Sequence, residues 1–255
     1  MSALPAPPRP CYRNTVPVRP ERIPGPVPTA ALSTLDLAAV ALFLVAILGY
    51  GYATSIDAIE RRTIVGAVQR QRETWMRNMA FRDMRIVDAQ LLGGLSQGNA
   101  FFASTSAIII GGLTALLGSG DKMQVLLERI PYVAPSSPLQ LEFKLLLLIT
   151  IFIFAFFKFA WAFRLSHYAA IMIGSTPILD TANHDACEDH ALRTARLVGI
   201  AAEHANAGIR AFYYAIAAMG WFFHPIAFIA ATTWVLLILV RRDFFSRSRR
   251  LLAGD

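Results

Sequence analysis

The segment "AAMGWFFHPIAF", residues 217–228, places the dipeptide His224-Pro225 at the middle of a long apolar run. This run, residues 211–240, contains thirty residues and no charged side chain. Thirty helical residues would be about 45 Å long, whereas the hydrocarbon core of a bilayer is about 30 Å thick. Pro225 cannot donate a backbone hydrogen bond, and the residue before a proline is biased away from helical angles. Two structures therefore fit the run: one long, kinked and tilted helix, or a re-entrant hairpin that folds back near His224.

Three further apolar runs precede this segment in the chain. The run at residues 99–118 carries small side chains at every fourth position, which in lipid let two helix backbones approach closely. The run at residues 141–163 has a lysine near each end and Trp161 close to its second end, an arrangement typical of a helix anchored at both membrane interfaces. We therefore predict four transmembrane helices, at residues 35–53, 99–118, 141–163 and 211–240.

The overall composition supports a membrane protein. Of the 255 residues, 55% are hydrophobic and only 16% are charged. No polar stretch is long enough to bury a core of its own, so residues 33–245 are expected to form one membrane domain. Residues 1–32 contain nine of the fourteen prolines, which predicts a disordered Pro/Arg-rich tail, and residues 246–255 form a basic C-terminal tail.

Two polar stretches lie between the apolar runs and are expected to be helical. In residues 57–92 the apolar side chains recur at the helical period, whereas most arginines point to other sides. Such an amphipathic helix can lie on the membrane surface or against the other helices. Residues 181–208 are expected to form a second, more polar helix. The predicted fold class is all-α: an integral membrane helical bundle of about four transmembrane helices plus two amphipathic interfacial or cytoplasmic helices.

The distribution of basic residues differs between the two structures for residues 211–240. If all four runs cross the membrane once, each side carries 11 Lys and Arg. If the last run returns to its starting side, 16 of these residues face one side and 6 the other, which is the usual asymmetry of cytoplasmic and external loops. A re-entrant loop, however, must be shielded by protein, which the kinked helix does not require. We favour the kinked helix slightly, and the sequence leaves both alternatives open, with a cytoplasmic 54–98 stretch in a multi-pass protein of the bacterial inner membrane.

The excess of positive charge predicts lipid rather than nucleic acid as the partner. Arginine supplies 21 of the 24 basic residues, and these are spread over short segments beside apolar runs. The expected partners are therefore the lipid bilayer and anionic lipid headgroups, and a membrane-protein partner or a homo-oligomer is left open. The two cysteines, Cys11 and Cys187, predict neither a disulfide nor a cysteine metal site, and no cofactor is predicted.

The candidate polar site, for an anion or a lipid, comprises Arg72, Trp75, Arg164, Asn206, Arg210, Tyr213 and His224. Several of these residues lie near one expected membrane boundary. Arg164, Asn206 and Arg210 are expected to bind an anion or a lipid, and Tyr213 lies close to Arg210 in sequence. The alternative is that Arg210 and Tyr213 only anchor a helix at the headgroup level. His224, expected near the middle of the membrane, needs a partner: it can bond the carbonyl freed by Pro225, bind metal or haem, or relay protons.

The segment "HDACEDH", residues 184–190, resembles a metal-binding cluster. His184 and Glu188 share one face of a helix, but His190 lies about 120° away from His184 by the helical period. A solvated acidic first turn, favoured by the helix dipole, explains the cluster without a metal. The alternative is a metal site of His184, Glu188 and His190 completed by another chain.

Four segments of the chain resemble one known family. They are "RRTIVGAVQRQRETWMRNM" (61–79), "AFFASTSAIIIGGL" (100–113), "FAFFKFAWAFRLSHY" (154–168) and "GIRAFYYAIAAMGWFFHPI" (208–226). Together they are similar to the membrane proteins grouped as domain of unknown function 599, over residues 50–243. The resemblance implies a multi-spanning membrane protein without an assigned activity. The residues that occupy its motif positions are Arg72, Trp75, Arg164, Arg210, Tyr213, Trp221 and Pro225.

No motif of nucleophilic, nucleotide-dependent or metal-dependent catalysis occurs in the chain. We therefore expect a non-catalytic accessory or scaffold subunit, or a membrane protein that binds lipid or a small solute between the third and fourth spans. One alternative is a metal- or haem-dependent membrane enzyme that uses His224 and the cluster from His184 to His190. A second alternative is a small-solute transporter.

Overall fold

The computed structural model describes residues 32–54, 56, 59, 62–119, 137–178 and 183–254. These residues form α-helices and contain no β-strand. The helices are α1 (Thr34–Thr54), α3 (Ile64–Ala80), α4 (Ile86–Leu117), α6 (Pro138–Gly174), α7 (His184–Phe223), α8 (Pro225–Phe245) and α9 (Arg247–Ala253). Four stretches are long and apolar enough to cross a membrane: Thr34–Thr54, Ile86–Leu117, Pro138–Gly174 and Pro225–Ala253. The predicted all-α membrane fold is thereby confirmed.

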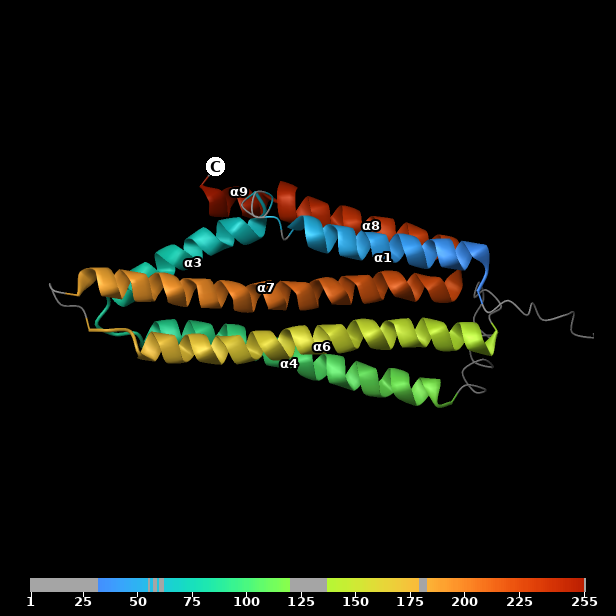
Figure 1. Ribbon diagram of the computed structural model, residues 1–255, viewed down its shortest axis with the longest axis horizontal. Coiled ribbons are helices and arrows are strands. Elements are labelled where there is room, and N and C mark those ends of the chain that lie inside the picture. Colours follow the sequence, from blue (N-terminus) through green and yellow to red (C-terminus); the bar gives the residue numbers. More distant parts are fainter. Residues whose placement is uncertain are drawn as a thin grey trace, which may run out of the picture.

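Three long helices run the length of the molecule. Helices α4, α6 and α7 contain 32, 37 and 40 residues, which corresponds to about 48–60 Å each. In Figure 1, α1 and α8 lie beside one half of α7, and α3 lies beside its other half, while α4 and α6 line the opposite side of α7. We call the first part the hairpin half (residues 34–54, 99–117, 138–163 and 204–245) and the second part the α3 half (residues 64–98 and 164–203).

The run at residues 211–240 is divided between two antiparallel helices, α7 and α8, which meet at His224 (Figure 1). His224 has an extended backbone, with φ −162° and ψ 147°, and its Nδ1 accepts a hydrogen bond from the Ile226 N–H at 3.2 Å. The Arg242 guanidinium lies 5.8 Å from the centre of the Tyr213 ring, a contact that only a fold-back permits. The kinked-helix expectation was therefore wrong, and the chain forms the hairpin.

The geometry around Gly220 explains how the two helices of the hairpin come so close. A Cβ atom at this position would lie 3.1 Å from the Ala227 carbonyl oxygen, so a larger residue would push α8 away. The Trp221 and Phe228 rings stack across the turn with centroids 5.5 Å apart. His224 thus lies exposed at the tip of the hairpin rather than at the middle of a helix, and its ring caps α8 instead of bonding a carbonyl freed by Pro225.

The hairpin is not a short re-entrant loop. Its first arm is long, because α7 begins at His184, well before the apolar run. The predicted polar helix at residues 181–208 and the first half of the last apolar run are thus one continuous helix. The sequence expectation separated them because their compositions differ, but the backbone hydrogen-bond pattern of a helix continues regardless of whether its surroundings are polar or apolar.

The predicted helix at residues 57–92 is also divided differently. Helix α3 ends at Ala80, and α4 begins at Ile86. Arg85 joins the two ends, because its guanidinium donates to the carbonyl oxygens of Ala80 at 3.2 Å and of Thr176, beyond the end of α6, at 2.8 Å. Helix α3 packs against α7 with the buried residues Met76, Met79 and Ala80, so it belongs to the bundle.

Separate hydrophobic clusters fill the two halves. The α3 half contains Met76, Met79, Leu92, Ile173 and Val198, among others. The hairpin half contains a larger aromatic cluster, which includes Phe43, Phe152, Tyr214, Trp221 and Phe228. Of the predicted tail at residues 1–32, residues 1–31 lie outside the described residues. The predicted C-terminal tail contains the short helix α9, which Gln71 of α3 contacts through a hydrogen bond to the Leu252 carbonyl at 3.2 Å.

Candidate functional site

An open groove between α6 and α7 carries three basic side chains. The Lys158 ammonium lies 3.5 Å from Nδ1 of His204, and Arg164 donates from Nε to the Tyr168 hydroxyl at 3.0 Å. The groove has a volume of about 680 Å³. Its lining residues are Phe154, Phe157, Lys158, Ala160, Trp161, Arg164, Tyr168 and His204. None of these lining residues is acidic, so the groove presents positive charge beside an exposed aromatic surface. We call it the basic groove.

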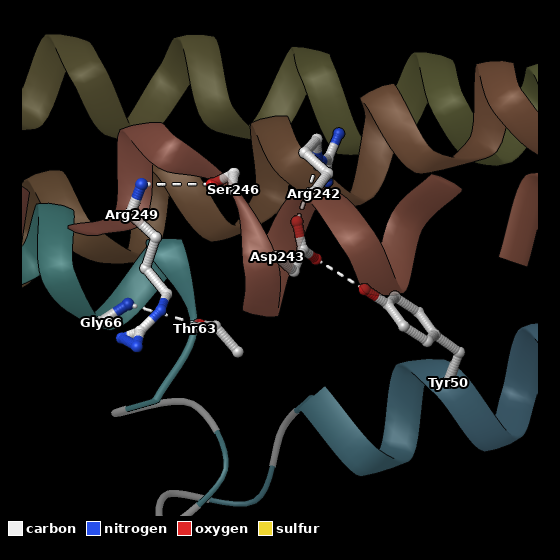
Figure 2. Close-up of polar contacts among 7 residues, drawn as sticks. All are labelled: Tyr50, Thr63, Gly66, Arg242, Asp243, Ser246 and Arg249. Atoms are coloured by element: carbon white, nitrogen blue, oxygen red, sulfur yellow. Dashed lines mark hydrogen bonds and ion pairs between the residues drawn. The ribbon is translucent and has the colours of Figure 1, made fainter. Parts of the chain in front are cut away.

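A second polar group joins α1 to α8 at the end of the hairpin half that is away from the α7–α8 turn (Figure 2). The Asp243 carboxylate accepts a hydrogen bond from the Tyr50 hydroxyl at 2.6 Å and another from Nε of Arg242 at 2.8 Å. Asp243 is only 1% exposed. Arg210 of α7 lies within electrostatic range of the Tyr50 hydroxyl. This Asp243 cluster neutralises a buried carboxylate inside a largely apolar part of the protein.

A third polar group lies at the opposite end of the hairpin half. The Asp36 carboxylate accepts from the Trp221 indole N–H at 2.7 Å and from the Ser33 hydroxyl at 2.7 Å. The Lys144 ammonium lies 5.8 Å from the centre of the Trp221 ring and interacts electrostatically with Asp36. These contacts connect the N-terminal end of α1 to the hairpin, and they satisfy an acid that is 7% exposed.

A fourth group holds α3 against α4. The fully buried carboxylate of Asp88 accepts hydrogen bonds from the Trp75 indole N–H at 2.7 Å and from Nη1 of Arg82 at 2.9 Å. Both bonds reach the same oxygen, Oδ1, and Oδ2 has no partner among the described residues. Arg82 is half-exposed, so the pair lies at the border between the core and solvent.

A small internal cavity, partly open to the surroundings on one side, lies between α3, α4, α6 and α7. Its volume is about 90 Å³. Its lining residues are Arg72, Leu92, Leu95, Asn99, Ser166, Val198, Ala201, Ala202 and Ala205. Burial lowers the pKa of the Arg72 guanidinium, and the negative charge of Glu203 opposes this shift. The cavity is therefore apolar on most sides, with a cation and two neutral polar groups on the rest.

The structure distributes the predicted candidate residues over several places rather than one. Arg72 lines the internal cavity, and Trp75 bonds Asp88. Arg164 lies in the basic groove, whereas Arg210 and Tyr213 face the Asp243 cluster. Asn206 is half-buried on α7, and His224 is at the hairpin tip. Arg164 and Arg210 thus do not converge, because they lie on different helices and face different neighbours.

The three predicted metal ligands each contact a different group. The His184 ring stacks on Phe81 with centroids 5.0 Å apart, and Glu188 forms an ion pair with Arg77 at 3.2 Å. His190 contacts the Met172 carbonyl oxygen through Nε2 at 2.8 Å. In the part of the chain that the structure places, no three His, Cys, Asp or Glu residues come together in a group able to hold a metal ion.

Sequence reasoning missed the acids that organise three of these polar groups. Asp36, Asp88 and Asp243 all lie within or at the ends of long apolar helices, and all are buried. An acid inside such a helix is costly unless a partner neutralises it or donates hydrogen bonds to it, which is the signal that could have identified them. The partners themselves, such as Tyr50 for Asp243, are too distant in sequence to be paired by periodicity.

Comparison with known proteins gives one match. The family described as "Protein of unknown function, DUF599" matches residues 38–248, which is most of the chain. No curated protein and no solved structure matches the chain significantly. The matched region includes the basic groove, the internal cavity and the Asp243 cluster. The four apolar helices and the match over most of its length show that this chain is a membrane protein that belongs to the DUF599 family.

Proposed function

We propose that this protein is a non-catalytic membrane protein that binds anionic lipid headgroups in the basic groove between α6 and α7. The observation that supports the proposal is the groove itself, in which Lys158, Arg164 and His204 come together beside exposed aromatic rings and without an acid in the lining. In such a lipid, the phosphate of the headgroup would contact the basic side chains, and an acyl chain would contact the aromatic rings.

The depth of the groove supports this assignment. In Figure 1 the start of α1, the end of α4, the start of α6 and the α7–α8 turn lie at one end of the molecule. About twenty helical residues cross the hydrocarbon core. When twenty residues are counted from that end along each helix, the second membrane boundary lies at approximately residue 54 in α1, 97 in α4, 158 in α6, 203 in α7 and 245 in α8. Lys158 and His204 thus lie at the second membrane boundary, and Arg164 lies just beyond it.

In this arrangement α7 provides a fifth crossing. Between residues 205 and 223 its one charged residue is Arg210, which faces the Asp243 cluster. Outside these five crossings, and with Lys158 counted at the boundary, 14 Lys and Arg lie on the side of the groove and 6 on the other side, so the groove faces the cytoplasm. The cytoplasmic leaflet is the one that carries anionic lipids.

Cysteine accessibility tests the orientation. In a chain with Cys11→Ser and Cys187→Ala, we introduce Ser119→Cys between α4 and α6 or Ser248→Cys in α9. Because three crossings, α6, α7 and α8, separate these two positions, a membrane-impermeant maleimide added to sealed vesicles should label one of them from outside and the other only after permeabilisation. Labelling of both from the same face would contradict the five-crossing arrangement.

Lipid binding is tested by removing the two permanent charges of the groove. We expect the double variant Lys158→Gln/Arg164→Gln to retain phosphatidylglycerol at least tenfold more weakly than the unmodified chain, because each surface cation contributes about 1 kcal/mol to binding of an anionic headgroup. The measurement is native mass spectrometry of protein released from vesicles of phosphatidylglycerol and phosphatidylcholine in equal amounts.

The matched control removes two charges from α7 instead of the two groove charges of α6. Arg193 and Arg196 are exposed and lie in the α3 half, away from the proposed boundary. The variant Arg193→Gln/Arg196→Gln should retain phosphatidylglycerol like the unmodified chain. If both double variants lose the lipid equally, the effect reflects net charge and the groove is not a lipid site.

A further inference from the structure

Arg72 carries hydrogen-bond donors that the protein does not use. Its side chain is half-buried on α3, on the side of the internal cavity. Among the residues that the structure describes, it makes one hydrogen bond, from Nη1 to Oε1 of Gln69, and this bond is long at 3.4 Å. A guanidinium has five N–H donors in a planar fork, so several of them are free for a ligand.

Asn99 of α4 is a second polar group without a protein partner. It is 9% exposed and lines the same cavity as Arg72. No described residue forms a hydrogen bond with its side-chain amide, so the amide N–H groups are available to a ligand in the cavity. Ser166 on α6 completes the polar lining, and its hydroxyl donates to the Ala162 carbonyl at 2.9 Å. Two donor groups from different helices thus face one small cavity that is partly open to the surroundings.

The charge of the cavity is positive. Arg72 is its one charged lining residue, and the rest of the lining is Asn, Ser, Leu, Val and Ala. Glu203, which is exposed on the surface of α7, acts on Arg72 electrostatically from outside the cavity lining. A half-buried cation beside apolar side chains is costly unless an anion or a polar ligand compensates it.

We propose that this cavity is a binding site for a small monovalent anion of the chloride or nitrate class, held by Arg72 and the Asn99 amide. Its volume of about 90 Å³ equals that of roughly three water molecules, which accommodates such an ion together with water. A lipid headgroup with its glycerol and acyl chains does not fit this volume. The site is therefore distinct from the basic groove and does not depend on lipid binding there.

The test compares chloride with gluconate, an anion too large for the cavity, at constant potassium concentration and ionic strength. We expect chloride to raise the unfolding temperature of the detergent-purified full chain by about 3–5 °C when its concentration exceeds the dissociation constant tenfold. The rise should saturate, because it follows from occupation of one site. The direct measurement is broadening of the ³⁵Cl resonance in solutions of the protein, which nitrate should reverse by competition.

Two variants locate the effect. Arg72→Gln removes the charge and should abolish both the temperature rise and the line broadening. Ala202→Leu fills the cavity but leaves Arg72 in place, and it should have the same outcome, which keeps the test decisive if Arg72→Gln does not fold. The lipid-groove variant Lys158→Gln/Arg164→Gln should respond to chloride like the unmodified chain. If chloride and gluconate act alike on the unmodified chain, or if Ala202→Leu keeps the chloride effect, the cavity holds water only and the proposal is wrong.

Discussion

Replacement of Asp243 by alanine is expected to lower the free energy of unfolding by about 3–5 kcal/mol, because the change leaves a half-buried arginine without its counter-charge. Asp243 is 1% exposed and accepts hydrogen bonds from both Tyr50 and Arg242 (Figure 2). Its removal also leaves the Tyr50 hydroxyl without a partner in a largely apolar region. The measurement is the unfolding midpoint in detergent, followed by circular dichroism.

Two controls separate the buried cluster from an ordinary surface ion pair. Tyr50→Phe removes one hydrogen bond to a charged group and keeps the Arg242 pair, so we expect a loss of about 1.5–3 kcal/mol. Asp189→Ala breaks the exposed pair with Arg193, in which both side chains are more than half exposed, and should cost less than about 1 kcal/mol. An Asp243→Ala variant as stable as Asp189→Ala would show that α1 and α8 do not depend on this carboxylate.

Gly208→Ala is expected to destabilise the protein by about 1–3 kcal/mol through overpacking. A Cβ atom at this position would lie 2.6–2.8 Å from three ring atoms of Phe159. This ring is fully buried, stacked on Phe102 and in edge contact with Phe212, so it has little room to move. Without the clash, alanine would stabilise the middle of a helix by up to about 1 kcal/mol, so the expected sign is opposite to the intrinsic helix preference.

Gly199→Ala provides the matched control, because Gly199 lies on the same helix. Its Cβ atom would lie 2.5 Å from Oε1 of Gln69, which is the end of a flexible side chain that can rotate away. We expect Gly199→Ala to be close to neutral and Gly208→Ala/Phe159→Leu to recover part of the loss. The measurement is again the unfolding midpoint, and equal stability of the two glycine variants would contradict the close-packing interpretation.

Several features of the fold follow from local sequence because their causes are local. Pro225 lacks a backbone N–H and biases His224 toward an extended conformation, so a break in the last apolar run was predictable. The asymmetric distribution of Lys and Arg favoured the hairpin, whereas the need to shield a short re-entrant loop argued against it. This objection fails because α7 extends back to His184, and the junction of a polar helix with an apolar one carries no sequence signal of its own.

The candidate site was less predictable for a related reason. Helical periodicity indicates which residues share a face of one helix, but it does not say which helix that face contacts. Arg164 and Arg210 were grouped because both lie at one expected membrane boundary. In the structure Arg164 shares the groove with His204, whereas Arg210 faces α1 and α8.

Run length and composition decide whether a segment can be surrounded by lipid, so the amino-acid sequence alone indicates a helical membrane protein and the position of its first three apolar helices. The pairing of Tyr50 with Asp243, 193 residues apart, and the position of Arg72 and Asn99 beside one cavity emerge only in the folded molecule. Such contacts depend on the packing of several helices at once, and each side chain finds its partner only after all of those helices are in place.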